Sequence, residues 1–541
     1  MAAIAAKENV NYQPSEFKAI SIIVFGIKMF VMKNTKNIIF KVIVVFGLLF
    51  FCGGAFAQTP KPNVVIIYVD DLGYGDLSCY GATEVQTPNV DKLAENGIVF
   101  TDAHCSSSTC TPSRYSLLTG SYAFRNNASI LPGDAPLIID LDTPTLPGML
   151  QKNGYKTAVI GKWHLGLGDG DVDWNGKITP GPLEVGFDYS YLIPATGDRV
   201  PCVMVENHHV VGLDPEDPIQ VSYKKKVGTD PTGLEQPELL RYQADKEHSK
   251  TIVNGVSRIG YMSGGNSARW NDETVPHQML HKARQFMNQN QDNPFFLYFA
   301  FHDIHVPRLP DYRFKGTTDM GVRGDAIVQM DWVTGQLMQH LENLGVSENT
   351  MIIFSSDNGP VLNDGYEDKA IEMLGEHKPG GPFRGGKYSA YEAATRVPTI
   401  VQWPGVIQPG KSDALIGHTD FYASIASIVG HELTEKEAPD SYNLINALTG
   451  KSKKGRDFLM EQSYTYSLRK GNYKYIKPVK KWKPDWIEEK KGIESGSSFK
   501  PQLFDLSKDI WEENNLADKK PKLVKQMQAE LSRILNEDQS R

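Results

Sequence analysis

The chain has 541 residues, of which 40% are hydrophobic and 22% are charged, and its mean hydropathy is −0.35. This is the composition of an ordinary globular protein, and it excludes collagen-like, coiled-coil and disordered chains. The formal net charge is −7 without a long basic block, which argues against nucleic-acid binding because that requires many Lys and Arg side chains. The length allows three or four domains, but large α/β proteins often place most residues on one sheet, so we expect fewer, larger units.

The first 57 residues resemble an export signal in composition. Residues 32–36 form a basic segment that leads into the apolar run 42–51, and Ala55-Phe56-Ala57 supplies the small residues that a signal peptidase needs. A single membrane anchor is the alternative, but the apolar run is too short to span about 30 Å of hydrocarbon. The sequence therefore predicts export rather than anchoring.

We accordingly predict a signal peptide region at 1–57, with the true translation start at Met32 and a mature chain that begins at Gln58. The mature chain is expected in the periplasm or outside a bacterial cell, without a stable membrane span. Lipid attachment at Cys52 stays open, although the bulky Phe51 before it argues against a lipoprotein.

Cysteines are too few for a disulfide scaffold in a chain of this size. The four that follow the signal region are Cys79, Cys105, Cys110 and Cys202. An exported protein without such a scaffold can keep a thiol for chemistry, and a bridge between Cys79 and Cys105 stays open.

Four apolar runs, each followed by polar residues, indicate strands of a mostly parallel sheet that alternate with helices. They are 63–69, followed by Asp70 and Asp71; 157–160, followed by Lys162 and His164; 295–301, followed by His302 and His305; and 351–355, followed by Asp357 and Asn358. Open α/β sheets bind ligands beyond the carboxyl ends of their parallel strands. We therefore expect these polar side chains to share one crevice.

The acidic members of this set predict a metal site. Asp70, Asp71, Asp357 and the side-chain oxygen of Asn358 are hard ligands without sulfur or imidazole, which suits one Ca²⁺ ion, with Mg²⁺ less favoured. Neighbouring strand residues face opposite sides of a sheet, so Asp70 and Asp71 can share an ion only where the strand gives way to a turn, and Gly73 permits one. Turn and helix-cap roles are the alternative for each aspartate.

The segment 110–120, with the sequence CTPSRYSLLTG, is the most informative stretch of the chain. Pro112 suits the first turn of a helix that Gly120 ends. Cys110 then lies at the helix N-terminus, where free N–H groups and the helix dipole favour an anion, and Arg114 can reach back to the same place. A buried structural cysteine is the alternative.

This segment resembles the signature of the type I sulfatases, in which the cysteine is oxidised after translation to formylglycine. The segments VDDLGYGD, GKWHLG, FHDIHVP, SSDNGP, FRGGKYSAYE and TRVP are similar to the same family and follow its order. The resemblance covers about 60–540 and is weakest at 198–270. It implies an alkaline phosphatase-like α/β fold with a large, mostly parallel sheet flanked by helices. It also implies a sulfuric ester hydrolase and a formylglycine-generating maturation enzyme as partner.

The resemblance also implies residue roles. Cys110 becomes the formylglycine, whose hydrate attacks sulfur, and it joins the four Ca²⁺ ligands named above. Arg114 and Lys162 match residues that hold the formylglycine, and His164 matches a base that assists elimination. His305 and Lys387 match groups that bind sulfate and protonate the leaving oxygen.

Further residues near this motif set have more than one interpretation. His302 is either a substrate-side group or a residue that supports the site from outside it. Glu392 and Arg396 either orient Lys387 or form an ordinary structural ion pair.

The substrate is predicted from the least familiar part of the chain. The stretch 194–209 carries planar hydrogen-bonding groups of the kind that bind sugar hydroxyls and carboxylates, among them Arg199 and His209. It resembles inserts of bacterial polysaccharide sulfatases. We expect a sulfated glycan, with an algal type such as ulvan ahead of an animal glycosaminoglycan. Ordinary loop roles for Arg199 and His209 are the alternative.

The predicted domains are a catalytic domain at 58–450 and a C-terminal subdomain at 451–541. Strand-like stretches at 456–464, 465–477 and 500–506, followed by a helix at about 519–538, resemble a small antiparallel sheet with a packed helix. The lysine-rich stretch 478–491 is expected to be a solvated loop, with carbohydrate contact through Trp482 or Trp486 as an alternative.

Two competing functions remain open at the level of sequence. One is a phosphonate or phosphodiester hydrolase of the same superfamily, because related enzymes also combine formylglycine with a metal. The other is a glycan-binding protein that keeps the fold without catalysis.

Overall fold

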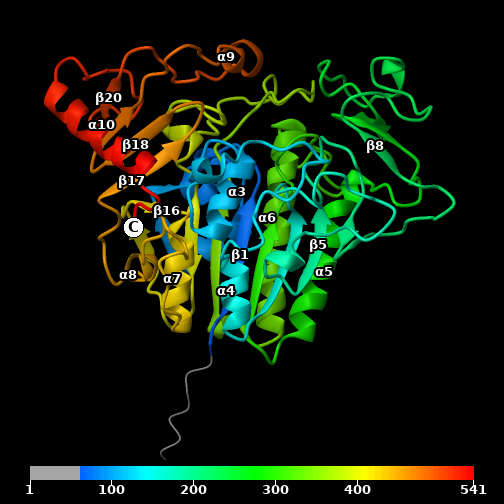
Figure 1. Ribbon diagram of the computed structural model, residues 1–541, viewed down its shortest axis with the longest axis horizontal. Helices are drawn as coiled ribbons and strands as arrows, with labels where there is room; N and C mark the ends of the chain where they lie inside the picture. The colour runs from blue at the N-terminus through cyan, green and yellow to red at the C-terminus, as the bar shows by residue number, and fades with distance from the viewer. Residues whose placement is uncertain (1–60) are drawn as a thin grey trace, which may run out of the picture. The chain divides into compact units, whose positions relative to one another are not determined.

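The computed structural model describes residues 61–541, so the predicted signal peptide region, the start at Met32 and the mature start at Gln58 lie outside the described residues. A ten-stranded sheet forms the centre of this part of the chain (Figure 1). In order across the sheet, its strands are β15 (Gly410–Ser412), β2 (Ile98–Phe100), β14 (Thr399–Gln402), β13 (Thr350–Ser356), β1 (Asn63–Val69), β12 (Phe295–Ala300), β4 (Lys156–Lys162), β5 (Tyr189–Ile193), β6 (Val205–Glu206) and β7 (His209–Val210).

The five central strands, from β13 to β5, are parallel, and antiparallel pairs flank them on both sides. Every residue of β1, β12 and β13 is buried, because helices cover both faces of the sheet and β-branched and aromatic side chains fill the space. The predicted mostly parallel α/β sheet is confirmed. The strand predicted at 157–160 extends to Lys162, so Lys162 itself belongs to β4.

Helices form a layer on each face of the sheet (Figure 1). On one face α3 (Cys110–Thr119), α4 (Leu146–Lys152) and α7 (Asp420–Val429) pack together, and on the other face α2 (Pro88–Glu95), α5 (Val275–Gln289) and α6 (Gly321–Asn343) pack together. The short helix α8 (Ile445–Leu448) packs on α7. Within residues 61–541, none of the helices combines the length and apolar composition needed to cross a membrane.

Three small two-stranded sheets lie outside the large one. They are β9 (Ile252–Val253) with β10 (Val256–Ser257), β8 (Gln220–Ser222) with β11 (Tyr261–Ser263), and β3 (Ala103–His104) with β16 (Ile416–Gly417). The first two belong to the stretch 198–270, where the sequence resembles known families least. Short strands joined by long loops give this stretch an irregular surface above the sheet.

The C-terminal part is a four-stranded antiparallel sheet with a packed helix, as predicted. The elements are β17 (Phe458–Gln462), β18 (Tyr466–Lys470), β19 (Tyr473–Ile476), β20 (Gln502–Asp505) and α10 (Pro521–Asn536). Val524, Met527, Leu531 and Ile534 of α10 are buried, because their spacing places them on one helical face. The stretch predicted as one strand at 465–477 is a hairpin, because Gly471 adopts a positive φ of 53° and turns the chain.

The stretch 478–491 is not the simple loop predicted from its lysines. Its last residues form the helix α9 (Trp486–Lys491), which ends at Gly492 in the left-handed conformation. Ile487 of this helix is fully buried. A helix of this length covers less than two turns, which is too short for hydrophobic periodicity to reveal it in the sequence.

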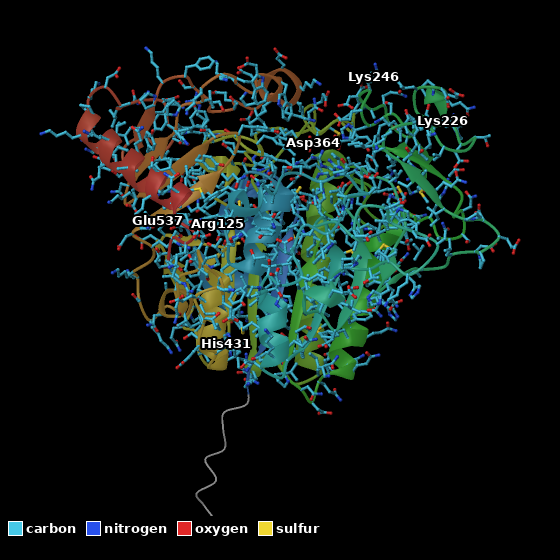
Figure 2. The ribbon with its side chains drawn as sticks, in the orientation of Figure 1. Arg125, Lys226, Lys246, Asp364, His431 and Glu537 are labelled. Atoms are coloured by element: carbon cyan, nitrogen blue, oxygen red, sulfur yellow. The ribbon has the colours of Figure 1, made fainter. Side chains whose placement is uncertain are left out.

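The C-terminal sheet supports the nucleophile segment. Gln462 of β17 accepts a backbone hydrogen bond from Ser108 and donates one to Ser106, at 2.8 and 2.9 Å, just before α3 begins. Beyond the C-terminus of α3, Arg125 binds Asp440 and the carbonyl of Glu537, the residue that follows α10. Figure 2 shows Arg125 and Glu537 side by side. The two sheets are therefore joined along this boundary, and residues 61–541 form one compact unit.

Candidate functional site

The polar residues predicted to share a crevice do follow strands that end together. Val69 at the end of β1 pairs with Ser356 of β13, while Tyr68 pairs with Ala300 of β12, which in turn pairs with Gly161 of β4. The chain then leaves all four strands at one edge of the sheet. Figure 2 shows Asp364, a residue of this region, at that edge of the molecule.

Three aspartates form a buried acidic cluster at this edge. Carboxylate oxygens of Asp70, Asp71 and Asp357 lie within 4.8 Å of one another, and all three residues are at most 1% exposed. Asn358 completes the group, because its amide nitrogen donates to Asp71 Oδ1 at 2.7 Å. The buried oxygens Asp70 Oδ1 and Asn358 Oδ1 have no hydrogen-bond partner. Oxygen atoms left without partners beside three carboxylates are what a hard cation requires, so the predicted ligand set fits Ca²⁺.

The backbone turns at Asp71 itself, which explains how two neighbouring aspartates face one centre. Asp71 adopts φ of 61°, a left-handed conformation that is costly for a residue with a side chain. Gly73, expected to permit the turn, has φ of −78°. It serves close packing instead, because a Cβ atom there would lie 2.2 Å from the carbonyl oxygen of Pro379.

Buried cations balance the acidic cluster. Arg114 donates from Nε and Nη2 to Asp357 at 2.9 and 2.7 Å, and Lys162 binds Asp70. Burial raises the pKa of Asp70, and Asp357 raises it further, while Lys162 lowers it less than these two raise it. The cluster therefore favours either a proton on Asp70 or a bound cation.

Cys110 lies where the sequence predicts it, at the first residue of α3. Its Sγ lies 3.2 Å from Nδ1 of His164, and Nε2 of His164 lies 2.9 Å from the carbonyl oxygen of Leu131. Because a carbonyl can only accept, Nε2 carries the proton and Nδ1 faces Cys110 as an acceptor. Burial, with Lys162 and Arg199 nearby, holds the pKa of His164 well below its usual range. His164 is thus neutral and oriented to take a proton from residue 110.

The thiol of Cys110 is a poor nucleophile in this environment. Burial raises its pKa, and the nearby Lys162 and Lys387 only partly offset this effect. A thiolate is the reactive form of cysteine, so a protonated buried thiol is inert. All four cysteines of the described chain, including Cys79 and Cys105, are free, so the bridge left open between those two is not formed in this structure.

His305 and Lys387 lie on the other side of the acidic cluster. Nζ of Lys387 lies 2.9 Å from a carboxylate oxygen of Asp71, and Nε2 of His305 lies 3.8 Å from Asp71 Oδ2. Nδ1 of His305 lies 2.7 Å from the carbonyl of Val306, which leaves Nε2 facing the cavity. Burial and Lys387 hold the pKa of His305 well below its usual value. Burial also lowers the pKa of Lys387, but Asp71, Tyr388 and Asp364 together outweigh it and raise that pKa well above its usual value. Lys387 is therefore the protonated member of the pair.

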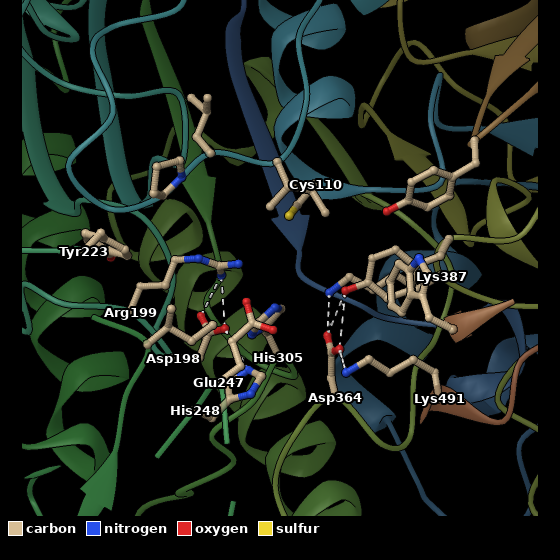
Figure 3. Close-up of a pocket in the computed structure, with 17 residues that line it drawn as sticks. Cys110, Asp198, Arg199, Tyr223, Glu247, His248, His305, Asp364, Lys387 and Lys491 are labelled. Carbon is tan, nitrogen blue, oxygen red and sulfur yellow. Dashed lines mark hydrogen bonds and ion pairs between the residues drawn. The ribbon is translucent and has the colours of Figure 1, made fainter. Parts of the chain in front are cut away.

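A cavity of about 350 Å³ opens above Cys110 (Figure 3). The predicted residues Cys110, Arg199, His305 and Lys387 line it. Its other lining residues that carry a charge or an aromatic ring are Asp198, Tyr223, Glu247, His248, Asp364, Tyr388, Tyr464, Trp486 and Lys491. Most of this second group could not be found from the sequence, because all except Tyr388 lie outside the quoted motifs, in loops or in the C-terminal part.

Asp364 joins two lysines at one wall of the cavity. Lys387 and Lys491 lie 3.1 and 2.7 Å from its two carboxylate oxygens, as Figure 3 shows. Burial opposes ionisation of Asp364, but the two lysines outweigh it and hold its pKa well below the usual range. Lys491 is the last residue of α9, so the C-terminal part of the chain contributes directly to the wall that carries Lys387.

Asp198, Arg199 and His248 form the opposite wall (Figure 3). Arg199 Nη1 donates to both carboxylate oxygens of Asp198 at 2.9 and 3.0 Å, and His248 lies 3.5 Å from the same carboxylate. Bonds to Asp198 and Asp245 outweigh burial and raise the pKa of His248 to about 9. This wall offers fixed donors and an acceptor to a polar ligand.

The two histidines predicted as substrate contacts do not line the cavity. His209 is exposed in β7 at the edge of the large sheet, where the strands continue away from the crevice. The ring of His302 is packed against Gly197, and burial lowers its pKa to about 4. The rings of His302 and His305 lie 6.2 Å apart between centroids and are tilted by 45°, so His302 supports that residue from outside the cavity.

Glu392 and Arg396 form an ion pair at 3.2 Å within a separate buried network rather than orienting Lys387. Glu392 also binds Arg469 of β18 at 2.8 Å and Lys474 of β19 at 3.0 Å. The network therefore joins the catalytic part of the chain to the C-terminal sheet. The structural interpretation of this ion pair is the one that the contacts support.

Comparison with known proteins identifies relatives of the whole described chain. The family model described as Sulfatase matches residues 62–431. An N-acetylgalactosamine-6-O-sulfatase of Bacteroides thetaiotaomicron is 49% identical over 90% of this chain and 94% of its own length, and human arylsulfatase A is 31% identical over 87% and 86%. Among solved structures, a sulfatase from work on glycosaminoglycan metabolism by Bacteroides thetaiotaomicron has a TM-score of 0.86 at 49% identity, covering 88% of this chain and 99% of that one. The chain is a sulfuric ester hydrolase and belongs to the sulfatase family.

Proposed function

We propose that this enzyme removes the 6-O-sulfate of N-acetylgalactosamine units in a sulfated glycan. One observation supports the proposal: Cys110 and Lys387 line one cavity, Nδ1 of His164 lies 3.2 Å from Sγ of Cys110, and Lys387 binds Asp71 of the acidic cluster. The 49% identity to an N-acetylgalactosamine-6-O-sulfatase supports the sugar and the position of its sulfate. The sequence-based prediction of an algal glycan such as ulvan is not supported by this relative. We propose a glycosaminoglycan as the substrate instead.

The proposal requires that Cys110 is converted to formylglycine by a maturation enzyme of the producing cell. Two observations support this. The thiol is held protonated by burial, so unmodified Cys110 has little reactivity, and helix α3 directs its free N–H groups toward an anionic group at this position. Arg114 and Lys162 bind Asp357 and Asp70, and the positive charge of Lys162 acts on residue 110.

We propose that the acidic cluster, together with residue 110, holds one Ca²⁺ ion, with Mg²⁺ less favoured. Such an ion, when bound, stabilises negative charge that develops on sulfate oxygens. Asp70, Asp71, Asp357 and Asn358 would hold it, because the carboxylate oxygens of the three aspartates converge, Asn358 binds Asp71, and the buried Oδ1 atoms of Asp70 and Asn358 have no hydrogen-bond partner.

Removal of the cation is expected to lower activity at least about 100-fold and to lower stability. Ca²⁺ restored at 100 times its Kd adds about 2.7 kcal/mol to the free energy of unfolding. Activity and urea unfolding of chelated protein, before and after addition of Ca²⁺ or Mg²⁺, measure both effects. Full activity in protein that elemental analysis shows to be free of metal would contradict the proposed site.

Three side chains are assigned to proton transfer and sulfate binding. His164 takes a proton from residue 110 through Nδ1, because its other nitrogen is fixed by Leu131. Lys387 donates a proton or a hydrogen bond to the leaving oxygen, since its pKa keeps it protonated. His305 binds the sulfate through Nε2, and an anion at that position favours its protonated form.

Arg199 is proposed to bind sugar hydroxyls rather than sulfate. Asp198 fixes the guanidinium and, with His248, presents acceptor and donor groups to the same region. We expect Arg199→Ala to lower kcat/KM for a sulfated sugar about 10- to 100-fold, because a hydrogen bond to a charged group contributes about 1.5–3 kcal/mol. A small aryl sulfate should lose much less. Steady-state kinetics on both substrates test this, and equal losses would show that Arg199 serves the reaction rather than the sugar.

The phosphonate or phosphodiester alternative has weaker support. A phosphonate monoester hydrolase from Silicibacter pomeroyi shares the fold at a TM-score of 0.56, but its 18% identity shows the fold alone. Turnover of matched aryl sulfate and aryl phosphodiester substrates separates the two reactions. Faster phosphodiester cleavage would overturn the proposal.

We further propose that the enzyme acts in the periplasm or outside the cell, with a catalytic domain at 58–450 and a C-terminal subdomain at 451–541. The basic and apolar segments of residues 32–57 support export. The start of the C-terminal sheet at Phe458 supports a boundary near residue 450.

A further inference from the structure

The cavity above Cys110 is small for a polymeric substrate. Its volume of about 350 Å³ lies at the lower end of the range for small-molecule sites. It therefore accommodates the sulfated sugar and leaves the attached sugar units outside. The surface beside its mouth then decides whether the enzyme also binds those units.

A row of aromatic rings leads from the cavity wall to the protein surface. Tyr388 contacts Trp486 at 5.3 Å between ring centroids, Trp486 contacts Tyr464 at 5.9 Å, and Tyr464 contacts Trp482 at 5.9 Å. Tyr388, Trp486 and Tyr464 line the cavity, whereas Trp482 does not. Exposure rises outward, from 8% at Tyr388 to 42% at Tyr464 and 57% at Trp482.

The segment that carries Trp482 and Trp486 is joined to the cavity wall at its end. Lys491 at the end of α9 binds Asp364 at 2.7 Å, and Asn363 donates to the carbonyl of Lys490 at 3.1 Å. Tyr464 lies in the turn between β17 and β18 and contacts both Trp482 and Trp486, so the outer rings lie beside the cavity. Two exposed aromatic side chains held in this way offer flat apolar surface at little cost in conformational entropy.

The charge around Trp482 indicates the kind of ligand. The chain carries a net charge of −7, yet Lys477, Lys480, Lys481 and Lys483 flank Trp482 in the sequence, and the acid that follows them, Asp485, lies 4.0 Å from Lys483. Lys480 and Lys481 are exposed. Local positive charge on an acidic protein favours an anionic partner, and a glycan that carries sulfate or carboxylate groups combines anionic groups with flat sugar faces.

We propose that Tyr464 and Trp482, with the surrounding lysines, form an outer subsite that stacks on the sugar unit next to the sulfated one in an anionic oligosaccharide. This inference rests on the proposed function and extends it from a sulfated sugar to a sulfated chain. The subsite makes the enzyme prefer oligosaccharides to the corresponding monosaccharide.

The test compares kcat/KM for 6-sulfated N-acetylgalactosamine with that for a glycosaminoglycan tetrasaccharide that contains it. The wild-type enzyme should prefer the tetrasaccharide. Trp482→Ala should lower that preference about threefold to tenfold, through a higher KM for the tetrasaccharide alone, while Trp482→Phe keeps most of it because a ring remains. Trp511→Ala is the matched control, because Trp511 is 43% exposed but lines a different cavity.

The outcomes distinguish a wrong proposed function from a wrong assignment of the outer subsite alone. If the wild-type enzyme releases sulfate from neither substrate, the proposed function is wrong and the outer subsite fails with it. If sulfate is released but Trp482→Ala changes both substrates equally or changes neither, only the outer subsite is overturned.

Discussion

Replacement of Cys110 by alanine is expected to lower sulfate release at least about 10³-fold. The side chain of residue 110 lines the cavity, contacts the proposed base His164 at 3.2 Å and lies near Asp70 and Asp357 of the acidic cluster. Removal of a nucleophile costs this much or more, because binding and electrostatic stabilisation alone support only residual turnover. Initial rates on a sulfated sugar measure the effect.

Ser113→Ala is the control for this substitution. Ser113 lies in the same helix and is equally buried, but its hydroxyl donates to the carbonyl of Ser107 at 2.9 Å. The variant should lose a few tenths to about 1.5 kcal/mol of stability and keep most of its activity. Comparable losses in Cys110→Ala and Ser113→Ala would show that the helix position, rather than the nucleophile, limits the reaction.

Replacement of Lys474 by methionine is expected to destabilise the protein by about 3–5 kcal/mol. Lys474 is fully buried between the catalytic part and the C-terminal sheet, where its Nζ lies 3.0 Å from Glu392 and 3.1 Å from Glu461. Without it, Glu392 keeps Arg469 and Arg396 as ion-pair partners, whereas Glu461, within residues 61–541, keeps only His104. Burial also raises the pKa of a third neighbour, Glu512, to about 8, so this group already holds a proton at neutral pH.

Urea unfolding of Lys474→Met measures this effect, with Lys525→Met as the control. Lys525 is an exposed residue of α10, where loss of one surface charge should change the free energy of unfolding by less than about 0.5 kcal/mol. Because β17 of the same sheet pairs with the segment before α3, activity should fall along with stability. Equal unfolding midpoints in the two variants would show that the network contributes no net stability.

Much of the catalytic centre follows from local sequence. The strand 63–69 and the helix that begins at Cys110 are fixed by apolar runs, Pro112 and Gly120, and the structure has both at the predicted bounds. The meeting of Asp70 and Asp357 follows from the rule that parallel strands end at one edge. These predictions succeed because each depends on neighbouring residues or on a single topological rule.

The substrate side of the cavity could not be predicted in the same way. Asp364 meets Lys491 across 127 residues, and Asp198 meets His248 across a stretch of short strands and irregular loops. No periodic pattern encodes such contacts, and the short helix α9 that carries Lys491 leaves little signal. His209, a residue type suited to sugar binding, lies exposed on the edge strand β7 and does not line the cavity, which its local sequence does not reveal.

Mass spectrometry of the peptide that contains Cys110 tests the central claim most directly. The protein must be produced in cells with and without a formylglycine-generating enzyme, and each preparation must be assayed for sulfate release. We predict a peptide about 18 Da lighter than the cysteine form, in a fraction that rises in proportion to specific activity. A fully active preparation in which residue 110 is an unmodified cysteine would contradict the account.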